Sequence, residues 1–233
     1  MTSTDLENRI ESLANGLYKA RYPVFFTGAG ISTESGLPDF RGPNGVWTRR
    51  DKGLPPPVSK PWETVEPNSG HLALVELQKL NRLKFLISQN VDNLHLKSGI
   101  PPDLLAELHG NITRVRCKRC EKTFDRSAGK KTCDCGGALV SSVVDFGQSL
   151  PRKDISLSYH HSSESDLFVV VGSSLVVTPA ADMPAQAYKA GAKLVIINAE
   201  ETPFDSVAHL RFHEKVGEVL PPIVTRLKIL MGR

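Results

Sequence analysis

The chain alternates short apolar runs with longer amphipathic stretches. Four runs that are apolar apart from Thr27 and Lys84 are typical of strands buried on both faces: 24–27, 83–87, 167–171 and 194–197. Amphipathic periodicity predicts helices around them, at about 4–17, 69–80, 102–108, 182–190 and 216–231. Strands that alternate with helices in this way form parallel sheets. We therefore predict an α/β fold, a Rossmann-like parallel sheet with helices on both faces, together with a small additional domain.

Local signals refine three parts of this pattern. Thr4-Asp5-Leu6-Glu7 has the order of a capping box, which predicts the start of the first helix. Pro221 and Pro222 lie inside the last helical stretch and predict a kink or a fresh start there. In the helix at 69–80, Leu72 is among the residues expected to be buried. The proline-rich stretch from Gly53 to Pro67 predicts an extended loop.

Polar or glycine-rich residues follow each of the four predicted strands. They are Gly28-Ala29-Gly30, Gln89-Asn90-Val91-Asp92, Gly172-Ser173-Ser174 and Asn198-Ala199-Glu200. In parallel sheets, ligands bind at the carboxyl ends of the strands. A glycine turn that opens a helix also lets a phosphate approach free backbone N–H groups. The four segments together predict a dinucleotide site.

The four cysteines form two pairs, Cys117-Lys-Arg-Cys120 and Cys133-Asp-Cys135. Four thiolates bind zinc tetrahedrally and leave no open position, so we predict a structural zinc site rather than a catalytic one. The C-x-C spacing of the second pair strains the chelate turn, and Gly136-Gly137 can relieve it. Redox chemistry at the C-x2-C pair is the alternative. The segment has little core of its own and is expected to fold only with metal.

Composition adds little to this picture. The 233 residues carry a net charge of +4, which fits a solvated surface or an acidic partner, and a nucleic acid is neither excluded nor supported. The most apolar stretch, 167–181, is interrupted by Gly172 and Pro179, so no membrane span is predicted. No targeting segment is recognised at the start of the chain, which leads us to expect a cytoplasmic location with a nuclear one left open.

Taken in order, the motifs resemble those of the sirtuins. The resemblance rests on Gly28-Ala29-Gly30-Ile31-Ser32, Gly36-Leu37-Pro38-Asp39-Phe40-Arg41-Gly42, Gln89-Asn90-Val91-Asp92 and His109-Gly110, and it extends from about Thr27 to Val219. The continuation Gly42-Pro-Asn-Gly-Val-Trp-Thr48 is similar to the class IV branch. The resemblance implies NAD-dependent removal of acyl groups from protein lysines, with release of nicotinamide and O-acyl-ADP-ribose. It implies NAD as co-substrate, structural zinc and an acylated-lysine protein or peptide as partner.

The resemblance also assigns roles to residues. His109 is the candidate general base, because a histidine accepts protons near neutral pH; the alternative is a hydrogen-bonded histidine at a helix end. Asn90 and Asp92 are expected to take part in catalysis by holding the nicotinamide carboxamide and its ribose. Trp47 is expected over the nicotinamide, with burial in the core as the competing interpretation. The remaining cofactor contacts are assigned to Gly28, Ala29, Ile31, Ser32, Asp39, Phe40, Arg41, Gln89, Val91, Gly172, Ser173, Ser174, Asn198, Ala199, Glu200 and Val216.

Substrate capture is assigned to Val144, Phe146 and Gly147. This segment could pair with an extended peptide as an added strand, and an ordinary connecting strand is the alternative. The family's usual glutamate after the glycine is replaced by Gln148. We assign 1–44, 71–112 and 144–233 to the NAD-binding domain, and 45–70 and 113–143 to a small domain with the cofactor-side loop and the zinc module.

Two other functions use the same residues. Mono-ADP-ribosylation would keep the NAD site and change only the acceptor, and the sequence does not distinguish it from deacylation. A non-catalytic NAD sensor is disfavoured, because a sensor has no need of His109 together with Asn90 and Asp92.

Overall fold

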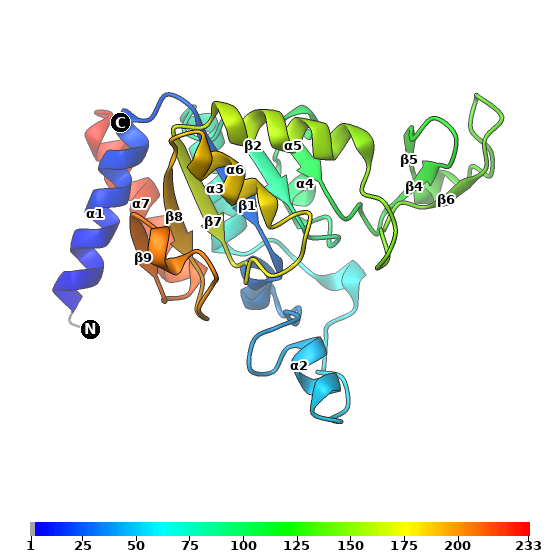
Figure 1. The fold of residues 1–233 in the computed structure, drawn as a ribbon, viewed down its shortest axis with the longest axis horizontal. Coiled ribbons are helices and arrows are strands. Elements are labelled where there is room, and N and C mark those ends of the chain that lie inside the picture. Colours follow the sequence, from blue (N-terminus) through cyan, green and yellow to red (C-terminus); the bar gives the residue numbers. More distant parts are fainter. Residues whose placement is uncertain (1–2) are drawn as a thin grey trace.

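The structure is a computed structural model and describes residues 3–233; residues 1 and 2, which the predicted NAD-binding domain includes, lie outside the described part. A central sheet is flanked by helices on both faces, and a small second sheet extends away from it beyond one end of the long helix α5 (Figure 1). The central sheet has the order β3-β2-β1-β7-β8-β9, and each neighbouring pair is parallel. Its strands are β1 (Pro23–Thr27), β2 (Phe85–Ser88), β3 (Leu105–Glu107), β7 (Leu167–Val171), β8 (Lys193–Ile197) and β9 (Leu210–Phe212).

Alternate strand residues enter two separate hydrophobic cores. Phe25 and Val169 belong to the core under α1 (Ser3–Lys19), α3 (Ser69–Lys79) and α7 (Val216–Leu230). Phe26 and Phe168 belong to the opposite core, under α5 (Arg152–Glu164) and α6 (Asp182–Lys189). All residues of β1 and β7 are buried, as strands covered on both faces require. The predicted α/β fold with helices on both faces is confirmed.

The remaining elements are short. They are the helices α2 (Val46–Asp51) and α4 (Leu94–Ser98) and the 3-10 turns η1 (Ala29–Ser35), η2 (Trp62–Thr64), η3 (Pro102–Leu104), η4 (Arg126–Ala128) and η5 (Asp205–Val207). The second sheet is antiparallel with the order β5-β4-β6, formed by β4 (Arg114–Cys117), β5 (Thr123–Asp125) and β6 (Leu139–Ser141). None of the helices in residues 3–233 has the length and apolarity needed to cross a bilayer.

One predicted helix is wrong. Residues 102–108 form the turn η3 followed by strand β3, which pairs in parallel with β2. Leu105 is 6% exposed and Ala106 is fully buried, so edge pairing and burial outweigh the local helical pattern. The sequence pattern also missed helix α5, because its inner face includes the buried polar residues Ser158 and Ser162.

Three smaller expectations are corrected as well. Helix α1 already includes Ser3, so Thr4 lies within the helix and does not cap it. Helix α7 runs without interruption through Pro221 and Pro222, so the predicted fresh start does not occur. Leu72 is 52% exposed and not buried, because it lies on the outer side of α3. The stretch between Gly53 and Pro67 is mostly irregular, as predicted, with only the turn η2 inside it.

Candidate active site and metal centre

Three of the four predicted strand-end segments meet through side chains at the carboxyl edge of the central sheet. Gln89 Nε2 donates to Ser173 Oγ at 2.7 Å, which joins the ends of β2 and β7. Asn90 Nδ2 donates to the carbonyl of Gly28 at 3.2 Å, and Ser32 Oγ donates to Asp92 Oδ2 at 2.6 Å. The structure therefore brings together polar groups that lie far apart in the sequence, at the place where parallel sheets bind ligands.

Gly28 and Gly30 are explained by packing of the main chain. A Cβ at Gly28 would lie 2.7 Å from the carbonyl oxygen of Gly172, and a Cβ at Gly30 would lie 2.7 Å from Gly172 Cα. Gly30 N donates to the carbonyl of Gly172 at 2.8 Å, and Gly172 itself has a φ of 64°. The turns after β1 and β7 thus touch backbone to backbone, which only glycine permits. This contact places the N–H groups of η1 at the sheet edge.

His109 lies two residues after the end of β3, half-buried, beside the Gln89 segment. Its Nδ1 is 2.8 Å from the carbonyl oxygen of Gln89, so Nδ1 carries the proton and donates to that carbonyl. Nε2 is then left as an acceptor. Burial lowers the pKa of His109, and the hydrogen bond to Gln89 opposes that shift in part. The neutral imidazole with a free lone pair on Nε2 is the form that a general base needs at neutral pH.

An aromatic cluster joins the Asp39-Phe40-Arg41 turn, called here the cofactor lid, to the predicted substrate segment 144–147. The ring of Trp47 lies 5.0 Å from that of Phe40 and 4.9 Å from that of Phe146, and the guanidinium of Arg41 lies 4.6 Å from the Trp47 ring. Phe40 is 43% exposed and Phe146 is 76% exposed, so the cluster lies outside both hydrophobic cores. The competing interpretation, that Trp47 is a core residue, is therefore wrong. Asp39 holds the lid turn by accepting from Gly42 N at 2.9 Å.

The predicted substrate segment is tied to the catalytic candidate. Val144 N donates to the carbonyl of His109 at 3.0 Å. From Asp145 onward the chain forms an exposed turn, in which Gln148 N donates to the carbonyl of Asp145 at 3.1 Å. Neither Val144 nor Phe146 lies in a strand, so the alternative of an ordinary connecting strand is not observed. Gly147 has a φ of 80°, which glycine adopts without strain.

The fourth strand-end segment lies at β8. Arg211 donates to the carbonyls of Asn198 and Glu200, both at 2.6 Å, and so fixes the backbone of this turn. Ala199 and Glu200 are exposed. By contrast, Ile31 is fully buried and Val216 is 5% exposed, and both side chains belong to the hydrophobic core. If these two residues contact a cofactor, the contact is through their backbone.

The residues not yet placed lie along the same edge. Ala29 begins η1, Val91 accepts a hydrogen bond from Ile112 N at 2.9 Å, and Ser174 is half-buried beside Ser173. Each is therefore next in the chain to a residue that forms a contact between strand ends: Gly28, Asn90 and Ser173, respectively.

Two buried histidines under the site were missed by sequence reasoning. His95 Nε2 lies 2.8 Å from Thr27 Oγ1, and the rings of His71 and His95 are 5.2 Å apart. Burial lowers their pKa values, to about 3 for His71 and about 4 for His95, so both are neutral. His71 also forms a capping box with Asn68 at the start of α3. An Asn-x-x-His pattern before an apolar run was the available signal for this cap.

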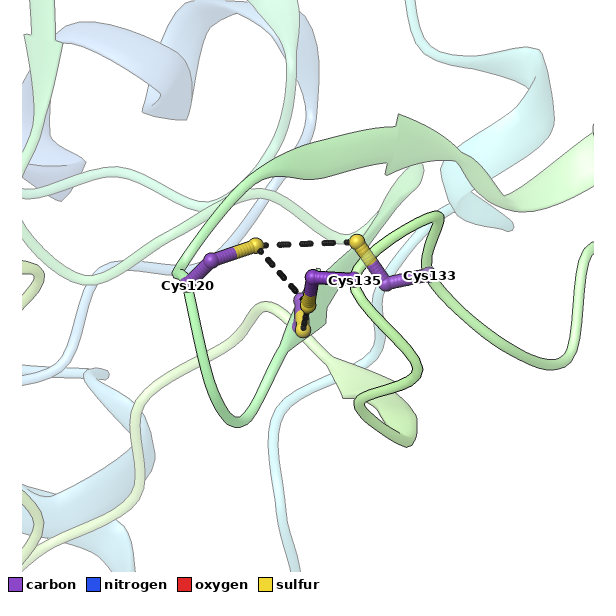
Figure 2. Close-up of side chains that lie close together, drawn as sticks. Cys120, Cys133 and Cys135 are labelled. Carbon is purple, nitrogen blue, oxygen red and sulfur yellow. Dashed lines mark hydrogen bonds between the residues drawn. The ribbon is translucent and has the colours of Figure 1, made fainter.

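The four cysteines converge in the small sheet. Their sulfur atoms all lie within 4.8 Å of one another, and Figure 2 shows Cys120 facing both Cys133 and Cys135. Tetrahedral Zn–S bonds of about 2.3 Å put sulfurs about 3.8 Å apart, close to the 3.5 Å between Cys117 and Cys135 and the 3.6 Å between Cys120 and Cys133. The donor set therefore fits zinc, and both members of the C-x-C pair belong to the cluster.

The glycines after the C-x-C pair are needed for this convergence. Gly136 has a φ of 80° and donates to the carbonyl of Cys133 at 2.8 Å. A Cβ at Gly137 would lie 2.5 Å from Cys117 Sγ. The N–H of Lys122 lowers the pKa of Cys120, but the neighbouring sulfurs of Cys135 and Cys133 raise it more, to about 12. A cation would remove that repulsion between sulfurs, since metal ligands bind as thiolates.

Comparison with protein families agrees with this geometry. A model described as the Sir2 family matches residues 28–60 and 57–179. A deacetylase of Bradyrhizobium diazoefficiens is 37% identical over 96% of this chain and 98% of its own length. The chain belongs to the Sir2 family. An NAD-dependent protein deacylase of Archaeoglobus fulgidus is 39% identical over 97% of this chain and 98% of its own length.

Other Sir2 relatives are longer than this chain. The NAD-dependent protein deacetylase SRT1 of Oryza sativa subsp. indica is 41% identical over 96% of this chain, and that of Arabidopsis thaliana is 40% identical. The chain spans about half the length of these two plant proteins, 49% and 50%. Among solved structures, one described as "Structural Basis for the Mechanism and Regulation of Sir2 Enzymes" superposes with a TM-score of 0.78 at 37% identity, over 96% of this chain and 99% of the other. One described as "Sir2-p53 peptide-NAD+" gives 0.74 at 33% identity, over 96% and 98%.

Proposed function

We propose that this Sir2-family chain is an NAD-dependent protein lysine deacylase that releases nicotinamide and O-acyl-ADP-ribose. The observation that carries the proposal is the state of His109, whose Nδ1 proton is held by the Gln89 carbonyl while Nε2 remains free. It lies at the edge of the sheet where Asn90, Asp92 and Ser32 also meet. The names of the relatives, deacetylases and a deacylase, support the same reaction.

NAD, when bound, supplies the electrophilic ribose carbon and nicotinamide as the leaving group. The chain's own residues orient NAD and the substrate and remove a proton from a ribose hydroxyl. Asn90 donates both Nδ2 protons within the chain, to the Gly28 carbonyl and to Ser32 Oγ, so its Oδ1 is left to accept from the N–H of a carboxamide ligand, and the residue is 8% exposed. Asp92 is held by Ser32 Oγ at 2.6 Å and by Leu94 N at 2.9 Å, so its carboxylate has a fixed orientation. His109 accepts a ribose hydroxyl proton at Nε2.

The lid and the substrate segment complete the site. Arg41 can meet a phosphate through its fork of donors, and its present ion pair with Asp51, at 3.7 Å, is long and exposed. Phe40 shields the reacting ribose from water. The acylated lysine reaches His109 past Val144, Phe146 and Gly147, and the free backbone groups of this segment take an extended peptide. Residues 45–70 and 113–143 form the small domain, in which zinc holds the module that anchors this segment.

The test is an assay with NAD and an acetyl-lysine peptide, read by mass spectrometry for nicotinamide, O-acyl-ADP-ribose and free lysine. The wild type should form all three in equal amounts. His109→Ala should lower turnover by at least about a hundredfold, the size of a general-base contribution, and unfold at the same temperature as the wild type. ADP-ribosylated protein that accumulates without loss of acetyl groups would favour mono-ADP-ribosyl transfer instead. Unchanged turnover in His109→Ala would remove the general-base assignment.

Two narrower assignments belong to this proposal. Membership of the class IV branch rests on the segment Pro43-Asn-Gly-Val-Trp-Thr48, which here forms the lid turn and the start of α2. A cytoplasmic location, with a nuclear one left open, is tested by expressing the full-length protein with a fluorescent tag and recording where it accumulates. Exclusive recovery from another compartment contradicts it.

A further inference from the structure

Asn111, two residues after His109, uses the full hydrogen-bonding capacity of its side chain. It is 1% exposed. Its Nδ2 donates to Glu107 Oε1 at 2.6 Å and to Asn93 Oδ1 at 2.8 Å. Its Oδ1 accepts from Thr113 N at 2.9 Å and from Thr113 Oγ1 at 2.8 Å. Two donors and two acceptor sites are therefore all paired, which an amide in a buried position achieves only with a defined set of neighbours.

The backbone of Asn111 is fixed by Ser142. Asn111 N donates to Ser142 Oγ at 3.0 Å, and the same hydroxyl donates to the carbonyl of Asn111 at 2.7 Å. Ser142 is 3% exposed. Gly110, between His109 and Asn111, has a φ of 76°, and a Cβ there would clash with the carbonyl oxygen of Ser142. The turn that carries His109 is therefore pressed directly against the start of the substrate segment.

The partners of Asn111 belong to three different binding segments. Asn93 follows Asp92 of the cofactor segment and has a φ of 67°, in the left-handed region that asparagine tolerates. Glu107 ends β3, and its carbonyl accepts from Gly110 N at 2.9 Å within the turn of His109. Ser142 leads into Val144, whose N–H bonds to His109. One buried residue thus joins three segments: its side-chain amide links the cofactor segment to the catalytic turn, and its backbone bonds to Ser142 at the start of the substrate segment.

We propose that Asn111 is a positioning residue that, through Asn93, Glu107 and Ser142, holds the Asp92 carboxylate, the His109 ring and the substrate segment in one fixed arrangement. The inference rests on the proposed function. Asn111 does not touch the reacting atoms; it acts through the elements that carry them. Misplacement of a catalytic group by about 1 Å can cost about a hundredfold in rate, so a network that fixes three segments at once has a direct effect on turnover.

The polarity of the contact between Asn111 and Glu107 gives a sharp test. Burial raises the pKa of Glu107 to about 7, while the hydrogen bond from Asn111 opposes that rise. At pH 8 Glu107 accepts and Asn111 donates. Asn111→Asp places its carboxylate against two acceptors, Glu107 Oε1 and Asn93 Oδ1. The pair Asn111→Asp with Glu107→Gln restores one donor and one acceptor at position 107 with the charge exchanged, and a turn of the Asn93 amide presents its NH2 group to the new carboxylate. A cavity of about 330 Å³ beside Glu107 and Asn111 lets water and side chains adjust around either variant.

We expect Asn111→Asp to lower kcat/KM for deacylation by about ten- to a hundredfold. Glu107→Gln alone should lower it by less than about threefold, because an amide oxygen still accepts. The double exchange should return to within about threefold of the wild type, which is the coupling that a double-mutant cycle measures. Ser142→Ala, which adds no charge, should lower it by about tenfold and replaces Asn111→Asp if that variant does not fold.

Two further measurements separate positioning from general damage. ADP-ribose affinity, determined by calorimetry, should change much less than kcat/KM in every variant, because the contacts assigned to Ser173 and Asn198 lie outside the network. Asp166→Ala is the matched control. Its carboxylate accepts from Arg21 N at 2.7 Å and from Tyr22 N at 2.9 Å at the amino end of β7, opposite the site. It should lower the melting temperature at least as much as the network variants and leave kcat/KM unchanged.

A readout that needs no catalysis keeps the inference testable if the proposed deacylation fails. The His109 ring signal is identified in NMR spectra by its loss in His109→Ala, and its titration reports the ring's surroundings. Asn111→Asp should shift that titration and the double exchange should return it. If Asn111→Asp or Ser142→Ala leaves both kcat/KM and the His109 titration at wild-type values, or if the double exchange does not rescue Asn111→Asp, the positioning role is wrong. If the wild type does not deacylate the peptide but the His109 titration shifts in Asn111→Asp and returns in the double exchange, only the proposed function is wrong.

Discussion

His109 has its lone pair on Nε2 because of one backbone contact, the hydrogen bond from Nδ1 to the carbonyl of Gln89. Burial lowers its pKa and keeps the ring neutral. Residue identity alone, a histidine before a glycine, left open whether this side chain was a base or a structural hydrogen-bonding group. Gly28 and Gly30 are similar cases, since their role is set by the neighbouring Gly172 backbone.

The pH dependence of kcat/KM should report the lowered pKa of His109. The active form is the neutral ring, so activity should be full above the pKa and fall as the pH drops through it. The midpoint of the acid limb should lie below 6.5, the ordinary value. Steady-state rates between pH 4.5 and 8 measure it, with the folded fraction followed by circular dichroism at each pH. An acid limb centred above 6.5 would contradict this prediction.

Gly30→Ala should destabilise the protein, because its Cβ would lie 2.7 Å from Gly172 Cα and 2.8 Å from the Gly172 carbonyl oxygen. Overpacking against backbone costs about 1–3 kcal/mol in the free energy of unfolding. Urea denaturation measures the change. Gly16→Ala is the matched control: its Cβ would meet only Leu167 Cδ2 at 3.9 Å, and it lies within α1, where alanine should stabilise by up to about 1 kcal/mol. Equal effects of both variants would refute the packing explanation.

The helices and strands differ in how well a local sequence pattern predicts them. Strand β7 was predicted with its observed bounds, because five consecutive apolar residues flanked by turn residues leave few alternatives. Residues 105–107 were predicted as helix and form β3, because pairing with β2 is a contact between distant segments. Helix α5 was missed because buried serines interrupt its apolar pattern. The small helix α2 carries Trp47 into contact with Phe146, another contact between distant segments.

The aromatic cluster predicts a fluorescence change. In a Trp62→Phe background Trp47 is the only tryptophan, since the chain has two. Phe146→Ala removes the ring 4.9 Å from Trp47, so more water should reach the indole and its emission maximum should move to longer wavelength. Emission spectra of the two folded variants measure the shift. Tyr188→Ala, an exposed aromatic residue on α6, should leave the spectrum unchanged; a shift of the same size in this control would show that the effect is not local.

At the scale of the whole molecule, the zinc module and the central sheet depend on different forces. The sheet is held by two hydrophobic cores. Residues 113–143, which form the three-stranded module, contribute no residue to either core. Its only buried hydrophobic residues among 113–143 are Cys117 and Cys133, both from the sulfur cluster. We therefore expect the module to depend on a bound metal, and the substrate segment that follows β6 to depend on the module.

Metal removal should unfold the module and leave the sheet intact. We expect about one zinc per chain, by the four-thiolate logic, and its removal by a chelator should raise hydrogen exchange in β4–β6 while β1 and β7 stay protected. Deacylation should fall with the loss of zinc, because Val144 loses its anchor beside His109. Hydrogen-exchange mass spectrometry and metal analysis measure both. Uniform loss of protection across the sheet, or protection of the module without metal, would contradict this division.

The sequence by itself determined the parallel α/β fold and the two close cysteine pairs; it also predicted a ligand site at the carboxyl edge of the sheet, and the resemblance to the sirtuins singled out His109 as the candidate base. These signals are local: an apolar run, a turn that follows it, and a short spacing between ligands are all readable within a few residues. Only the tertiary structure decided that β3 is a strand, that Trp47 bridges lid and substrate segment, and that Asn111 joins Asn93, Glu107 and Ser142. Those features are contacts between segments far apart in the chain, and their energies exist only once the fold has brought the partners together.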